Sequence, residues 1–90
     1  MASTLKDSKY VTANILLNKV FEVTVTADAS KTAVDVTMPS GVDVIGTVTG
    51  TATAVVKTPR SVANNVETQA VVTVTPSIAT ADCTAYVLIR

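Results

Sequence analysis

Alternation of apolar and polar side chains with a period of two residues is the feature that most constrains the fold. In the segment 20–26, Phe21 and Val23 are separated by Glu22, and the pattern continues in the same way. The segments 32–38 and 66–75 repeat it. Successive side chains of a strand point to opposite faces, so this pattern is typical of strands with one buried and one solvated face. Val and Thr, which favour strands, dominate the composition. We therefore predict an all-β protein.

Turn-forming residues divide the alternating runs at short intervals. Pro39 and Gly41 in the sequence MPSG have the spacing of a type I turn, and residues 58–65 are predicted to form a loop. We predict about seven strands, at 10–17, 20–26, 32–38, 42–49, 51–57, 66–75 and 82–89. Short strands at this spacing predict a two-sheet β-sandwich or a small β-barrel, forming a single domain over residues 1–90.

The first nine residues are the least regular part of the chain. Residues 1–9 are polar and are interpreted as a possible N-terminal arm. Thr4 and Asp7 have the spacing of a capping box, so a short helical turn over residues 4–9 is the alternative.

The charge balance argues against two classes of partner. The chain has seven basic and seven acidic residues and no run of like charge, whereas nucleic acids and anionic membranes select clustered basic residues. No apolar stretch approaches the ~20 residues of a membrane-spanning helix. The N-terminal residues MASTLKDSKY lack the apolar segment of a secretory signal, so we expect synthesis in a cytoplasm without export by that route.

Residue types that carry catalysis or metal binding are scarce. The absence of His removes the Ser-His-Asp and Cys-His arrangements and the usual zinc ligands. The acidic residues Asp28, Asp35, Asp43 and Asp82 do not have the spacing of a calcium loop. We therefore expect no enzymatic activity and no cofactor or metal.

Cys83 is the only cysteine, so an intrachain disulfide is impossible. We expect a small, partly buried core residue, because free cysteines are among the most buried residue types. An interchain disulfide is the alternative.

The C-terminal segment 82–89 is apolar on both faces. Tyr86 and Leu88 alternate with a second apolar set, and in an edge strand of a monomer they would promote aggregation. Ile15, Leu16 and Leu17 are also apolar on both faces. We predict that these five residues form a protein interface, within a homodimer or homotrimer or with another protein. The alternative is that a loop or the N-terminal arm of the same chain covers Leu88.

The polar lead MASTLKDSK, the strands FEVTVTAD and VVTVTPS, and the closing segment CTAYVLIR together resemble the small all-β decoration (cement) proteins of tailed bacteriophages. The resemblance is in overall sequence character and extends over the whole chain. It implies a virion structural protein that is made in the host cytoplasm, forms homo-oligomers, and binds the major capsid protein or another virion protein to stabilise the head by bridging capsomers. A stand-alone immunoglobulin-like adhesive or binding module is the alternative function.

Overall fold

The computed structural model describes residues 2–11 and 19–90, and within them the protein is all-β and contains no helix. The prediction of a small, single-domain all-β fold is confirmed. The described strands are β1 (Thr4–Val11), β2 (Lys19–Thr26), β3 (Val34–Thr37), β4 (Val44–Val48), β5 (Ala52–Thr58), β6 (Ser61–Ala63), β7 (Val66–Thr68), β8 (Val71–Pro76) and β9 (Asp82–Ile89).

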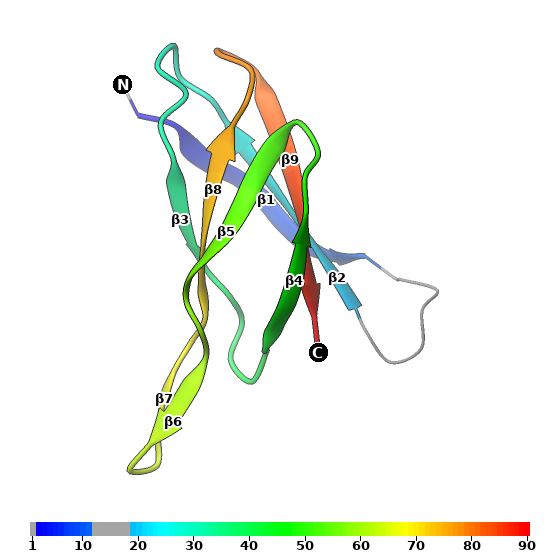
Figure 1. The fold of residues 1–90 in the computed structure, drawn as a ribbon. Coiled ribbons are helices and arrows are strands. Elements are labelled where there is room, and N and C mark those ends of the chain that lie inside the picture. The colour runs from blue at the N-terminus through cyan, green and yellow to red at the C-terminus, as the bar shows by residue number, and fades with distance from the viewer. Residues whose placement is uncertain (1, 12–18) are drawn as a thin grey trace.

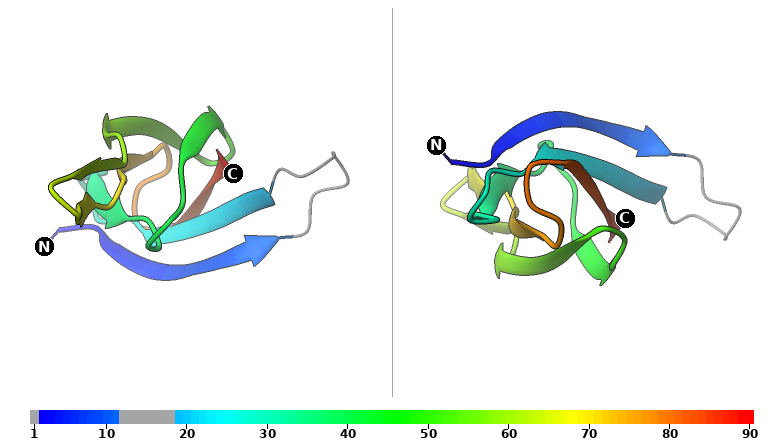
Figure 2. Two further views of the ribbon diagram at one scale, coloured as in Figure 1. Left: turned by 90° about the horizontal axis from the view of Figure 1, so that it is seen from below. Right: turned by 90° about the horizontal axis from the view of Figure 1, so that it is seen from above.

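The strands form three antiparallel sheets (Figure 1). A four-stranded sheet has the order β1-β2-β9-β4, and a three-stranded sheet has the order β3-β8-β5. These two sheets enclose the core in a sandwich-like arrangement, while β6 and β7 form a small hairpin of their own. Figure 2 shows β1 lying along β2 on the outside of the molecule.

The core is built from the inward positions of the alternating runs. β2 contributes Phe21, Val23 and Val25, and β9 contributes the equivalent positions Ala85 and Val87, all of them buried. The three-stranded sheet covers them with small side chains, namely Val36, Ala52, Ala54, Val72 and Val74. Valine and alanine dominate this core, so each residue contributes little apolar area and stability depends on many small contacts.

Cys83 lies in this core with no exposed surface. Its thiol contacts the backbone oxygen of Ile78 at 3.4 Å. The prediction of a core cysteine is confirmed, and its burial is complete where only partial burial was expected. Because the thiol is inaccessible, this conformation does not support the alternative of an interchain disulfide.

The N-terminal segment differs from the prediction. Residues 4–9 form most of β1 and not a helical turn, and β1 pairs with β2 from Thr4 to Val11. The predicted strand at 10–17 therefore began too late, and its residues 12–17 lie outside the described residues. Pairing with β2 overrides the capping-box signal, because a local motif cannot compete with a long antiparallel ladder.

A second difference concerns the predicted loop at 58–65 and strand at 66–75. Residues 61–63 and 66–68 form the β6–β7 hairpin, and the long strand is divided into β7 and β8. Asn64 and Asn65 occupy the turn with φ values of 51° and 63°. A two-residue hairpin turn with both φ values positive suits asparagine, which tolerates this conformation better than most residues.

Candidate functional site: the outer face of the four-stranded sheet

The face of the four-stranded sheet that points away from the core carries a group of neighbouring apolar side chains, bordered by Glu22 and Lys9 on the β2 side of Tyr86. Strand register aligns Val11, Val20 and Leu88 in one row and places Tyr86 beside Val48 in the next. We call these five residues the outer apolar face. Val48 is 46% exposed and the other four are half-buried. Partly exposed apolar side chains grouped on a sheet surface suit contact with another apolar surface.

The other end of the same face is polar. The hydroxyls of Thr24 and Thr84 lie 3.1 Å apart, and the Thr26 hydroxyl donates to Asp82 at 3.0 Å. Lys6 also forms an ion pair with Asp82. The hydrogen bond from Lys6 is the main cause that holds the pKa of Asp82 below its ordinary value. Glu22, which lies beside Tyr86 in the strand register, is paired with Lys9 at 3.8 Å, so the polar groups that border the apolar residues have partners.

Two glycines explain how Tyr86 and Leu88 become half-buried in a single chain. Gly46 lies opposite Leu88, and a Cβ at this position would stand 3.4 Å from Leu88 Cδ1. A Cβ at Gly50 would stand 3.4 Å from the Tyr86 ring and 2.4 Å from the backbone oxygen of Thr84. The absence of a side chain at Gly46 in β4 and at Gly50 in the turn that follows it leaves the backbone there open to Leu88 and Tyr86.

The position of β9 corrects one premise of the sequence interpretation. β9 is an inner strand that pairs with β2 on one side and with β4 on the other, so it is not an edge strand. Tyr86 and Leu88 do lie together on the outward side of the sheet. Ile15, Leu16 and Leu17 lie outside the described residues, and the interface that joins all five residues stays a prediction.

Sequence reasoning missed the residues that extend this face, Val11, Val20 and Val48. Each belongs to an alternating run, but their position beside Tyr86 and Leu88 depends on the strand order. The sequence shows that residues 11 and 20 are apolar. No local signal indicates that they align with Leu88.

A separate polar cluster holds the β6–β7 hairpin against the turn before β4. The Glu67 carboxylate accepts hydrogen bonds from the Gly41 backbone amide at 2.7 Å, from Arg60 Nε at 2.6 Å and from the Ser40 hydroxyl. Arg60 also lies 3.5 Å from Asp43. These donors, led by Ser40, lower the pKa of Glu67 to about 2. These contacts join the β6–β7 hairpin to the turn before β4.

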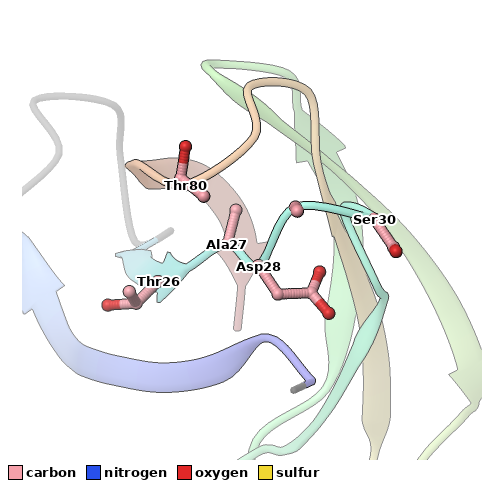
Figure 3. Close-up of a pocket in the computed structure, with 6 residues that line it drawn as sticks. Thr26, Ala27, Asp28, Ser30 and Thr80 are labelled. Atoms are coloured by element: carbon pink, nitrogen blue, oxygen red, sulfur yellow. The ribbon is translucent and has the colours of Figure 1, made fainter.

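A hollow of about 500 Å³ lies where β2 ends and the turn after it begins, beside Thr80 (Figure 3). Its only acidic residue is Asp28. One Asp28 oxygen accepts hydrogen bonds from the Thr32 amide at 3.0 Å and the Ser3 hydroxyl at 3.2 Å, and the other accepts one from the Thr32 hydroxyl at 2.9 Å. The carboxylate thus holds this turn through three hydrogen bonds.

Within residues 2–11 and 19–90, no group of three metal-ligating side chains comes together. No helix in the described part of the chain is long and apolar enough to cross a membrane.

The comparisons with known proteins return no relatives. No protein-family model matches the chain. No curated protein matches it in sequence. No solved structure matches its fold.

Proposed function

We propose that this protein is a virion structural protein that decorates a phage capsid and stabilises it by bridging capsomers. The observation that supports the proposal is the outer apolar face, on which Tyr86, Leu88 and Val20 stand next to one another on a sheet whose opposite side is already the core. A contiguous apolar area on the surface of a soluble domain is typical of a protein-binding site.

The chemistry around the face fits a passive binding role. Its polar end consists of threonines and the Lys6–Asp82 ion pair, which satisfy one another. Large protein interfaces combine an apolar centre with a polar rim. Here Tyr86 and Leu88 would lie at the centre, and the threonine end would lie at the rim.

The test is co-sedimentation of the purified protein with heads of the phage that encodes it. We expect wild-type protein to sediment with the heads and Leu88→Asp to remain in the supernatant, because a carboxylate in an apolar contact loses its hydration. Val48→Asp is a second variant at a more exposed position of the same face, where folding is less affected. Val66→Asp, on the β6–β7 hairpin and 66% exposed, is the matched control.

Circular dichroism establishes that each variant is folded. If folded Leu88→Asp and Val48→Asp bind heads as well as the control does, the outer apolar face is not the capsid contact. If wild-type protein does not bind heads at all, the decoration function is wrong. Binding of the wild-type protein to a cell-surface protein would then favour the immunoglobulin-like binding module.

A further inference from the structure

The strand β5 presents a long backbone edge that has no strand partner among the described residues. β5 pairs with β8 on one side, and the three-stranded sheet ends there. Elsewhere β5 approaches β9 and, near the turn that joins them, β4, but both belong to the other sheet and neither pairs with β5. Figure 1 shows β4 and β5 separating from this turn onward. An unpaired strand edge offers a row of amide and carbonyl groups to another strand.

The other edge strands of the two large sheets carry features that discourage such pairing. β1 contains Lys6, Asp7 and Lys9 and has a bulge between Leu5 and Asp7. β3 is four residues long and contains Asp35. β4 has five residues and a register shift between Val44 and Gly46. Charges, bulges and short length are the usual means by which proteins protect sheet edges.

β5 lacks these features along most of its length. It has seven residues, and the first five, ATAVV, contain no charge and no proline. Its register shift lies at the far end, between Val56 and Thr58. Val55 is 65% exposed and Val56 is 38% exposed, so the side chains along this edge are also apolar and accessible.

We propose that β5 pairs antiparallel with β5 of a second copy of this chain, joining the two three-stranded sheets into one continuous sheet. In a two-fold arrangement centred on Val55, this residue faces its own counterpart and Lys57 faces Thr53. No like charges meet, because Lys57 is the only charged residue of β5 and forms an ion pair with Asp35 at 2.6 Å. The same surface therefore complements itself, as a two-fold interface requires.

This edge is separate from the outer apolar face, which lies on the four-stranded sheet. The proposal does not depend on the capsid function, since a dimer through β5 would leave Tyr86 and Leu88 available for another partner. If the protein binds a capsid, the β5 dimer would carry two copies of the outer apolar face.

The experiment compares two substitutions that add the same charge at equally exposed valines. Val55→Lys lies at the centre of the proposed contact, and Val66→Lys lies on the β6–β7 hairpin, with exposed fractions of 65% and 66% in the native chain. By sedimentation velocity we expect wild type and Val66→Lys to have twice the 9.3 kDa mass of one chain. Val55→Lys should raise the dimer dissociation constant by about tenfold, because like charges would stand opposite each other.

A second measurement examines the contact directly. Val55→Cys should form a reducible covalent dimer under mild oxidation, and Val66→Cys should not, while the native Cys83 is buried and does not interfere. Three results would overturn the proposal: a monomeric wild-type protein across the concentration range, equal dissociation constants for the two lysine variants, or equal cross-linking of the two cysteine variants. A dimer that Leu88→Asp disrupts and Val55→Lys leaves intact would assign the contact to the outer apolar face instead.

Discussion

Replacement of Gly50 by alanine tests whether close approach of the chain to β9 shapes the outer apolar face. The added Cβ would stand 2.4 Å from the backbone oxygen of Thr84, a separation that such atoms do not adopt, so β9 or the turn must move. Overpacking costs about 1–3 kcal/mol, and a backbone obstacle belongs at the upper end of this range. Alanine also lowers the conformational entropy of the unfolded chain, which stabilises the folded protein by about 0.4–1 kcal/mol. The net loss in the free energy of unfolding is therefore about 2 kcal/mol.

Thermal and urea unfolding followed by circular dichroism measure this loss. For a domain of this size, about 2 kcal/mol corresponds to a decrease in Tm of roughly 8–16 °C. The turn supports the N-terminal half of β9 through a second contact, since the Thr51 hydroxyl accepts a hydrogen bond from the Thr84 amide at 2.8 Å. A shift of the turn would weaken this bond as well, so the decrease should be accompanied by changes in the amide signals of Thr84 and Tyr86.

The other two glycines are the controls. Gly41 has φ +80° and open space around its missing side chain, so Gly41→Ala measures backbone strain alone, about 1–2 kcal/mol. Gly46→Ala would make an ordinary contact with the flexible end of Leu88 and should change stability least. If Gly50→Ala is as stable as wild type, or less affected than Gly46→Ala, the close approach at Thr84 does not constrain the fold.

Two further predictions concern Glu67 and Cys83. The pKa of Glu67 is lowered to about 2 from an ordinary 4.5, so its contribution to stability is complete above pH 4.5 and is lost as the pH falls through about 2. An NMR titration should show the Glu67 carboxyl signal and the Gly41 amide changing together near pH 2, and a Glu67 midpoint near 4.5 would contradict the hydrogen-bonded cluster. Cys83→Ala should keep the fold and oligomeric state and destabilise the protein by about 1 kcal/mol in urea unfolding. A covalent wild-type dimer on a non-reducing gel would contradict the buried position of the thiol.

The sequence carried most of the information about the fold class because alternation is a local property. The residues that alternate in 20–26 became β2, and its inward positions Phe21 and Val23 are buried as expected. The hairpin at Asn64 and Asn65 was missed because its two strands have three residues each, too few for an alternating pattern to be recognised. β1 was misplaced because its side chains are mostly exposed, and only its pairing with β2 makes it a strand.

The candidate site was accessible from the sequence only in part. Tyr86 and Leu88 were identifiable because both faces of their segment are apolar. Their neighbours on the outer apolar face come from β1, β2 and β4, and the order in which these strands lie beside β9 is a non-local property. The role of Gly50 was equally hidden, since the sequence suggests a turn at this glycine but not the backbone that approaches it.

The inner position of β9 has a consequence for synthesis of the protein on the ribosome. β2 and β4, the two strands that pair with β9, are translated before it. Until residues 82–89 leave the exit tunnel, the facing edges of β2 and β4 have no partner, and Val23 and Val25 lack the neighbours that bury them. The emerging chain therefore cannot complete its core in stages and folds only once this segment is free. A ribosome stalled before Asp82 would carry an incomplete chain with open strand edges, the kind of species that chaperones bind and proteases remove.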